Sequence, residues 1–425
     1  MRIQVDSEIG RLRRVLVHRP GREIDRMPPS MMEQLLFDDI LYGDEAREEH
    51  DRFTQVMQKA GIEVLDGETL LAAVLREEGP RRRLLDELEH DYGVASGLVR
   101  RLSELPADQL AATLIEGSLA SPDAVEAGGR KFFDLAPLPN YFFQRDSQLV
   151  LGDRVVCPSM ATPAREREPL LSRNLFNYHP ALQGYAALFD IDVPPAGAPQ
   201  HDPLYPYPSL EGGDVLVASK EIVLMGMSER TDRRGVEVLA EYLRREETSF
   251  RHLILVEMPV KRSYMHLDTV FTLIDRNTCL AHLPVIEPGG REAAFVYYVD
   301  LYARELSFTV RPSLLSALAT LGMDLEVVPC GGAADAIEQQ REQWTDGANA
   351  FALAPGVLVL YSRNRKTIEE LGRRGFRVLT EEEAVTGDHD LLGGGRTVIT
   401  LAANELSRAR GGPRCMTMPI ERDPV

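Results

Sequence analysis

The stretch from Leu210 to Met225 shows the pattern that decides the fold. It runs Leu210-Glu211-Gly212-Gly213-Asp214, then the apolar run Val215-Leu216-Val217, then a second apolar run, Ile222-Val223-Leu224-Met225. Three further stretches repeat this order: Asp146 with Leu149–Leu151 and Val155–Cys157, Asp268 with Val270–Ile274 and Cys279–Ala281, and Asn349 with Phe351–Leu353 and Val357–Leu360. Short apolar runs bounded by turn residues are typical of strands. With a helix closing each unit, the pattern predicts an α/β fold of repeated ββα-type units.

The polar residue that opens each unit bears on function. Repeated units of this kind indicate a radial or stacked architecture, in which each unit closes its apolar face on its neighbours. Equivalent ends would then converge on one axis, where the carboxylates and the amide would form a pocket for a cation. For any one of these residues alone, a turn-forming role is the preferred explanation of its position.

The first 66 residues carry separate signals. Leu12 to His18 and Ile62 to Leu65 are predicted strands. Between them, the spacing of apolar residues predicts a helix from Met31 to about Ala60.

A charged, leucine-rich stretch with helical spacing then runs from Glu68 to Leu119. Strand signals resume only after Pro137-Leu138-Pro139. We therefore predict a catalytic domain formed by residues 1–66 and 125–425, with residues 67–124 as a helical insertion.

Composition limits the class of protein. The 425 residues are 44% hydrophobic and 27% charged, as in ordinary globular proteins. The formal net charge of −18 disfavours nucleic acid and anionic membranes and suits small cationic ligands, although such a surface also simply keeps a protein in solution. Because no signal-peptide core and no membrane-spanning run is found, we predict a cytoplasmic protein without nucleic-acid or membrane partners.

The four cysteines are widely spaced and include no CxxC pair, which argues against a disulfide framework or a zinc site. Cys415 lies in a glycine-rich stretch beside Arg410 and Arg414, which we expect to lower the pKa of its thiol. Cys157 and Cys279 fall in strand runs, and Cys330 before two glycines is a weaker rival nucleophile.

Asp146, Asp268 and Glu211 suit a guanidinium substrate, which is planar, permanently charged and best bound by carboxylates in its plane. His266, two residues before Asp268 and expected on the same side of an extended segment, can act as general acid and then general base. Each of these signals alone has an ordinary structural explanation, and their combination on one chain indicates an enzyme.

The chain resembles the arginine deiminase family nearly end to end. The matching strings are Val15-Leu16-Val17-His18-Arg19-Pro20-Gly21, Leu35-Leu36-Phe37-Asp38-Asp39-Ile40, Glu49-His50-Asp51, Gly226-Met227-Ser228-Glu229-Arg230-Thr231, the block from Arg341 to Asn364, and Arg414-Cys415-Met416-Thr417-Met418-Pro419. The resemblance implies a pseudo-fivefold-symmetric α/β propeller of the guanidine-modifying type with a helical insertion. It also implies hydrolysis of L-arginine to L-citrulline and ammonia, without metal or organic cofactor.

The resemblance also implies roles for individual residues. Cys415 would attack the guanidinium carbon to give an S-alkylthiouronium intermediate, and His266 would protonate the leaving ammonia and then activate water. Asp146, Asp268 and Glu211 would hold the guanidinium group. The residues expected to bind the rest of the substrate are Asn140, Phe143, Arg165 (or its neighbour Arg167), Arg230, Arg410 and Asp214.

Gln144 and Ser147 depart from the family pattern around Asp146, where a smaller residue is usual before the arginine. The departure leaves open a modified arginine or another guanidino acid as substrate, or full hydrolysis to ornithine. Three other readings also remain: an amidinotransferase, a divalent-metal site at His266, Asp268 and Glu211, and an arginine sensor without activity. A homo-oligomer also stays open.

Overall fold

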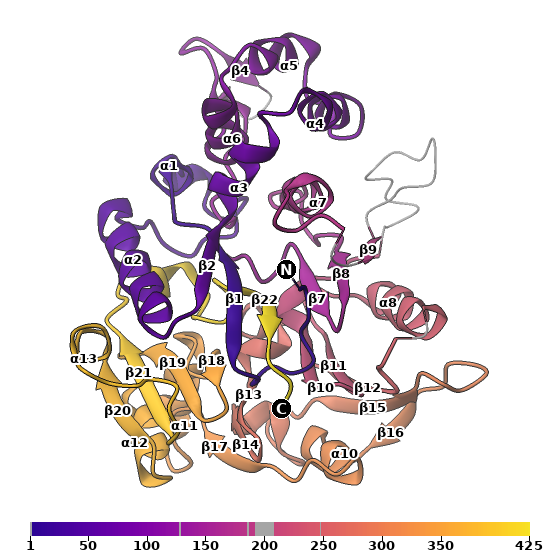
Figure 1. The fold of residues 1–425 in the computed structure, drawn as a ribbon, viewed down its shortest axis with the longest axis vertical. Helices are drawn as coiled ribbons and strands as arrows, with labels where there is room; N and C mark the ends of the chain where they lie inside the picture. The colour runs from indigo at the N-terminus through magenta and orange to yellow at the C-terminus, as the bar shows by residue number, and fades with distance from the viewer. Residues whose placement is uncertain (1, 127–128, 185–186, 192–207, 247) are drawn as a thin grey trace.

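The computed structural model describes residues 2–126, 129–184, 187–191, 208–246 and 248–425. Most strands fall into five sheets (Figure 1). Their strands are β1 (Leu12–Val17), β2 (Glu63–Asp66) and β22 (Met418–Arg422); β7 (Leu149–Leu151), β8 (Arg154–Cys157) and β9 (Ala187–Asp190); β10 (Val215–Ser219), β11 (Ile222–Met227), β12 (His252–Glu257), β15 (Phe295–Asp300) and β16 (Thr309–Arg311); β13 (Phe271–Asp275), β14 (Thr278–Ala281) and β17 (Glu326–Pro329); and β18 (Phe351–Ala354), β19 (Val357–Tyr361), β20 (Arg377–Thr380) and β21 (Thr397–Leu401). The predicted α/β class is therefore confirmed.

The five sheets share one pairing pattern. In four of them the first strand pairs antiparallel with the next strand of the chain, which pairs parallel with a third: β7-β8-β9, β10-β11-β12, β13-β14-β17 and β18-β19-β21. These are the four predicted pairs of apolar runs. In the fifth sheet, β22 near the end of the chain takes the first place, antiparallel to β1, which pairs parallel with β2.

In each of the five sheets a helix lies in the chain between the second and the third strand. Most of these helices lie at the outside of the molecule in Figure 1. The five helices are α2 (Gly43–Lys59), α7 (Glu168–Tyr178), α8 (Arg233–Arg245), α10 (Leu314–Thr320) and α12 (Arg365–Arg373). α8 buries one apolar face, since Val236, Leu239, Ala240 and Leu243 are buried while its arginines are not. α7 is buried on most of its surface. The Asp232 side chain caps α8 by accepting the Gly235 N–H.

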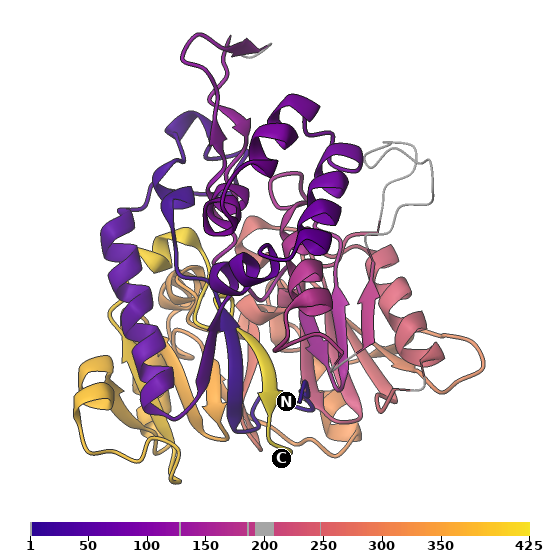
Figure 2. The same ribbon diagram turned by 45° about the horizontal axis from the view of Figure 1, so that its top comes forward.

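The stretch after β2 is helical, as expected. It forms α3 (Gly67–Val74), α4 (Glu78–His90), α5 (Ser96–Ser103) and α6 (Ala107–Glu116), which gather at the top of Figure 2. Asp66 begins α3 by accepting the Thr69 N–H at 2.9 Å. Buried leucines of these helices share one apolar core with the sheets of β7 and β10, so packing is continuous across the predicted domain boundary.

The helix predicted from Met31 to Ala60 is wrong in its first third. Residues Pro29–Met31 form a short 3-10 turn, and α2 begins only at Gly43. The intervening loop contains Leu36 in the left-handed region, at φ 66°. Arg262 donates to the Leu36 carbonyl at 2.7 Å, so a residue 226 positions away fixes a backbone that local spacing assigned to a helix.

No helix within the described ranges is long and apolar enough to span a membrane.

Candidate active site

A small cavity lies where segments that precede β7, β13 and β22 come together. Its free volume of about 20 Å3 is room for about one water molecule. The residues that line it are Leu36, Asn140, Phe143, Asp146, Arg165, Arg230, Arg262, Met265, His266, Thr269, Ala409, Arg410 and Cys415. A wider groove of about 1150 Å3 along α8 has neither cysteine nor histidine among its described lining residues, so the reactive groups gather in the small cavity.

Cys415 sits in a tight turn just before β22. Its backbone N–H and that of Arg414 donate to the Asn349 side-chain oxygen at 3.2 and 3.1 Å, and the Thr417 hydroxyl donates to the Pro413 carbonyl at 3.0 Å. Cys415 is buried, and its Sγ lies 3.7 Å from Asp268 Oδ2. The turn therefore holds the sulfur beside a carboxylate from another sheet.

The two glycines before this turn permit close packing. A Cβ on Gly411 would lie 2.2 Å from the Phe143 ring, and a Cβ on Gly412 would lie 2.6 Å from Asn349 Oδ1. Only a residue without a side chain allows both approaches.

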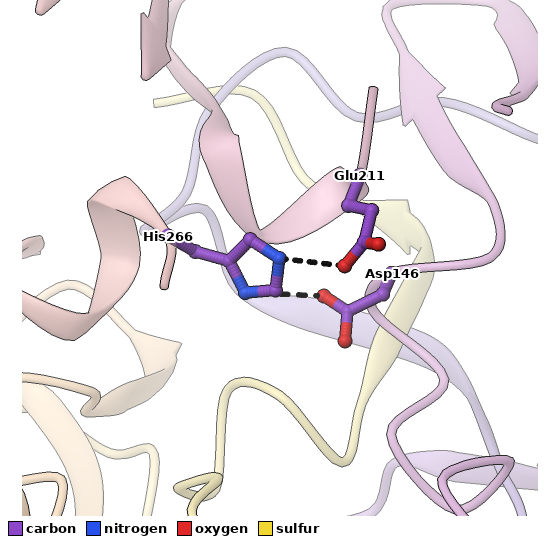
Figure 3. A group of neighbouring side chains, drawn as sticks. All are labelled: Asp146, Glu211 and His266. Atoms are coloured by element: carbon purple, nitrogen blue, oxygen red, sulfur yellow. Dashed lines mark hydrogen bonds and ion pairs between the residues drawn. The ribbon is translucent and has the colours of Figure 1, made fainter. Parts of the chain in front are cut away.

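His266 lies between two carboxylates (Figure 3). Its Nε2 is 2.9 Å from Glu211 Oε2, and its Nδ1 is 3.7 Å from Asp146 Oδ1. Burial acts to lower the pKa of His266, but Asp146, Glu211 and Asp214 overcome it and raise the pKa to about 9. Burial acts to raise the pKa of Glu211, but His266, Arg230 and Arg165 hold it at about 2. The pair is therefore an ionised carboxylate and a protonated imidazole at neutral pH.

Asp268 does not lie in extended backbone. It sits in the 3-10 turn η4 (Leu267–Thr269), so the expected alignment of His266 and Asp268 along an extended segment is wrong. In this turn the side chains of His266 and Asp268 contact different partners. His266 pairs with Glu211, whereas Asp268 Oδ2 accepts a hydrogen bond from Arg414 Nη1 at 2.7 Å.

The carboxylates of Asp146 and Asp268 share one feature. Asp146 Oδ2 accepts from Arg165 Nη1 at 2.6 Å, and Asp268 Oδ2 accepts from Arg414. In each case the other oxygen, Oδ1, is buried and accepts no hydrogen bond within the described residues. Asp146 lines the cavity, whereas Asp268 lies beside Cys415 and is not among the lining residues.

The expected lowering of the Cys415 pKa by its neighbouring arginines is wrong. Burial raises the pKa of the thiol well above its usual value, and Asp268, Asp146 and Asp346 raise it further. Arg410 stacks on Trp344, with its guanidinium carbon 3.3 Å from the ring centroid, and Arg414 is bound by acids. Burial and these acids therefore favour a neutral thiol.

The chain is matched by the family model "Arginine deiminase" over residues 33–422. An arginine deiminase of Listeria welshimeri is 36% identical over 436 residues, covering 99% of this chain and 98% of that protein. One of Bacillus cytotoxicus is 34% identical over 438 residues, covering 100% of this chain and 99% of its own.

The chain belongs to the arginine deiminase family.

Solved structures of low sequence identity share the fold. An amidinotransferase from Microseira wollei matches with a TM-score of 0.52 at 14% identity, over 100% of this chain and 98% of that one. The N-terminal domain of ArgZ, an arginine dihydrolase from cyanobacteria, matches with a TM-score of 0.50 at 14% identity, over 96% of this chain and 97% of that one.

The other predicted substrate-binding residues of this arginine deiminase family member differ in position. Asn140 lines the cavity and donates to the Leu35 carbonyl at 2.8 Å, and Arg230 lines it with Nη1 4.0 Å from Glu211. Asp214 does not line the cavity; it accepts the Leu267 N–H at 2.8 Å and so supports η4 from behind. Arg167 donates to backbone carbonyls of Leu114 and Ala136, outside the cavity lining, whereas Arg165 lies in it.

The residues that depart from the arginine deiminase pattern lie away from the cavity. The Gln144 amide donates to the Tyr141 carbonyl at 2.5 Å and accepts from Gln148 at 2.9 Å. The Ser147 hydroxyl accepts from the Ser172 hydroxyl at 3.4 Å. Neither residue lines the cavity. The departure from the family pattern around Asp146 therefore adds no side chain to the cavity lining.

Several residues at the site are not predicted by the sequence patterns. Arg262 and Met265 line the cavity, and the buried Glu8 binds Arg414. Leu36 also lines it and belongs to a string that matched the family, which is the one signal that could have found it. Glu8 lies in a segment without any motif.

The residues that could form a metal site differ from those expected from the sequence. Asp146, Glu211 and His266 form a group with ligand atoms within 4.8 Å of one another, and Asp268 is not part of it. The Arg165 guanidinium lies 2.6 Å from Asp146 and 3.7 Å from Glu211, so a cationic group already balances these acids. This donor set therefore fits a divalent metal poorly.

Proposed function

We propose that this protein hydrolyses L-arginine to L-citrulline and ammonia, with Cys415 as nucleophile and His266 as acid and base. The observation that carries the proposal is the pair of unbonded oxygens on Asp146 and Asp268, next to a buried cysteine and a protonated histidine. A buried acceptor without a hydrogen bond costs about 1–3 kcal/mol, which a bound N–H group would recover. A guanidinium group supplies such N–H groups together with a positive charge.

Substrate binding and thiol ionisation are coupled in this proposal. Burial raises the pKa of Cys415, and Asp268 and Asp146, which raise it further, are the acids that the guanidinium cation would neutralise. Arginine therefore favours formation of the thiolate that attacks it, and the thiol loses its proton only when a substrate is in place.

The chemical steps follow from the protonation states. The thiolate of Cys415 adds to the guanidinium carbon, and protonated His266 gives its proton to the departing nitrogen as the C–N bond breaks. Ammonia leaves, and an S-alkylthiouronium remains on the sulfur. His266, now neutral, takes a proton from water, the water oxygen adds to the same carbon, and the C–S bond breaks to release the thiolate. The remaining hydroxyl proton is lost to solvent, where ammonia takes it up, so that the arginine cation and water give citrulline and ammonium. Glu211 keeps the imidazole oriented throughout.

Arg230 is our first candidate for the substrate α-carboxylate. Its contacts to acids are long, 3.6 Å to Glu229 and 4.0 Å to Glu211, so its charge is weakly matched. Arg165 would join it only by exchanging partners, because it is bound to Asp146 and Glu168. The cavity must also widen, since its free volume takes about one water molecule.

We extend the proposal to architecture and location. The common pairing pattern supports a pseudo-fivefold-symmetric α/β propeller whose blades are the five sheets. Residues 67–124 would be an insertion into a catalytic domain of residues 1–66 and 125–425. The protein would act in the cytoplasm, without cofactor, as a monomer or as a homo-oligomer.

The test is product identification by mass after incubation with arginine and with other guanidino compounds. Citrulline and ammonia in equal amounts support the proposal. Ornithine with two ammonia molecules would indicate full hydrolysis, and turnover only with an added amine would indicate amidino transfer. Cys415→Ser must abolish turnover, and exhaustive chelation must leave it intact; failure of either contradicts the mechanism.

A further inference from the structure

The side chain of Arg414 joins two acids beside the nucleophile. It is 1% exposed and does not line the cavity. Its Nε and Nη2 donate to the two carboxylate oxygens of Glu8 at 3.0 and 3.1 Å. Its Nη1 donates to Asp268 Oδ2 at 2.7 Å, and that oxygen lies 3.7 Å from Cys415 Sγ. A continuous chain of contacts therefore runs from Glu8 through Arg414 and Asp268 to the sulfur.

Glu8 belongs to the segment before β1, 406 residues from its partner. Burial acts to raise the pKa of Glu8, but Arg414 and Arg145 hold it at about 2, so it is ionised. Glu8 Oε1 also accepts the Val217 N–H at 3.1 Å, which fixes the carboxylate to β10. Glu8, Arg414 and Asp268 together carry one net negative charge.

The burial of three charged side chains, Glu8, Arg414 and Asp268, calls for a functional explanation. Replacing a buried ion triad by well-packed apolar residues is often neutral or stabilising, so stability alone does not explain it. Its contact with the acid nearest the nucleophile points to a role at the reacting sulfur.

We propose that Arg414 and Glu8 are positioning residues: Arg414 fixes Asp268 beside Cys415, and Glu8 limits the positive charge that Arg414 places near the sulfur. This inference rests on the proposed function, in which Cys415 is the nucleophile. It assigns a task in the reaction to a residue of the N-terminal segment.

Other charges also face the sulfur and must be considered. Besides Asp268, the acids Asp146 and Asp346 act on Cys415. Across the cavity lie the cations His266, Arg165, Arg230, Arg262 and Arg410. All of these groups are left in place when Glu8 or Arg414 is replaced, so changes in thiol ionisation can be assigned to the altered pair.

The two substitutions have opposite expected signs. Arg414→Met removes a cation and leaves Glu8 and Asp268 uncompensated, so the thiol ionises at a higher pH. Glu8→Gln removes an anion, so Asp268 is then the one acid paired with Arg414. The positive charge near the sulfur is less compensated, and the thiol ionises at a lower pH. We expect shifts of about one pH unit in each direction. A merely structural role would not produce shifts of opposite sign.

The measurement is the rate of Cys415 alkylation by iodoacetamide as a function of pH in the full-length protein without substrate. Mass analysis of peptides identifies the labelled cysteine, because Cys157, Cys279 and Cys330 are also present and buried. Arg414→Lys retains the positive charge but loses the planar guanidinium group that binds two carboxylates at once. We expect an unchanged pH midpoint of alkylation, and a kcat about tenfold lower with little change in KM.

Arg173→Met is the matched control. Arg173 is largely buried and pairs with Asp190 at 2.8 Å and Glu87 at 3.2 Å, outside the site. We expect lower stability with an unchanged alkylation midpoint.

The proposal is overturned if Arg414→Met and Glu8→Gln shift the midpoint in the same direction or leave it unchanged. If Arg414→Met does not fold, Glu8→Gln decides, and a midpoint that fails to move down overturns the proposal. Failure of the proposed function looks different: the labelled residue would not be Cys415, or Cys415→Ser would still turn over arginine.

Discussion

Arg165 Nη1 lies 2.6 Å from Asp146 Oδ2, so a guanidinium group of the protein itself occupies one edge of a carboxylate that we assign to the substrate. The same side chain binds Glu168 at 2.8 Å and lies 3.7 Å from Glu211. Three buried carboxylates therefore share one cation, and the charge balance of the site depends on it.

Replacing Arg165 by Met should be severely damaging. The three acids would lose their common cation, and removing one partner of a buried ion pair typically costs about 3–5 kcal/mol. We expect a loss of that size in the free energy of unfolding, measured with urea, and a kcat/KM for arginine at least about 100-fold lower. Arg167→Met is the comparison, because Arg167 donates to backbone carbonyls outside the cavity; its activity should stay near the parent value. Equal activities of the two variants would contradict the assignment.

The pH–rate profile should report His266. Protonated His266 is the proposed acid, and its pKa in the substrate-free protein is raised to about 9, so kcat/KM should fall as the pH rises through about 9. Glu211→Gln removes a negative charge from the imidazole, which lowers its pKa and moves this alkaline limb to lower pH. The readout is kcat/KM for arginine, measured in steps between about pH 6 and pH 10. An alkaline limb that stays in place in the variant would remove His266 from this role.

Gly411→Ala should disturb the nucleophile turn. The new Cβ would lie 2.2 Å from the Phe143 ring, and such overpacking typically costs about 1–3 kcal/mol. We expect a lower urea midpoint and a reduced kcat, because the turn carries Cys415. Gly372→Ala is the control: that glycine lies in α12 with open space around its Cβ, and the change should be neutral or slightly stabilising. A fully active, fully stable Gly411→Ala would show that the turn tolerates a shift.

Gln144→Thr should leave substrate choice unchanged. Gln144 contacts Tyr141 and Gln148 and does not line the cavity. We expect kcat/KM for arginine within about twofold of the parent and the same ranking of guanidino compounds, with a stability loss of about 1 kcal/mol from the lost hydrogen bonds. A changed ranking would show that the family departure at this position does select the substrate.

The spacing of apolar residues predicts much of the fold correctly. It is misleading at the loop that borders the cavity. The runs 215–217 and 222–225 became β10 and β11 because strand signals within ten residues reinforce each other. The segment 32–42 has helical spacing, yet Arg262 and Asn140 hold its carbonyls in an irregular loop. Tertiary partners of that kind cannot be read from spacing.

Sequence patterns predict the site residues that stand out locally. They do not predict contacts with residues far away in the chain. Asp146, His266 and Cys415 line one cavity, and each stands out by residue type and neighbouring glycines or acids. The effect of Arg414 on the thiol was misjudged because its main partner, Glu8, is 406 residues away. The net charge around the thiol depends on such distant ion pairs. The residues next to Cys415 in the sequence do not reveal them.

The pairing of β22 with β1 has a consequence for biosynthesis. Cys415 stands three residues before β22, and that strand is held by a partner from the very start of the chain. A nascent chain therefore lacks a closed fifth sheet until β22 has left the exit tunnel of the ribosome, so the turn that carries Cys415 is fixed only after the strands of the other four sheets have been made.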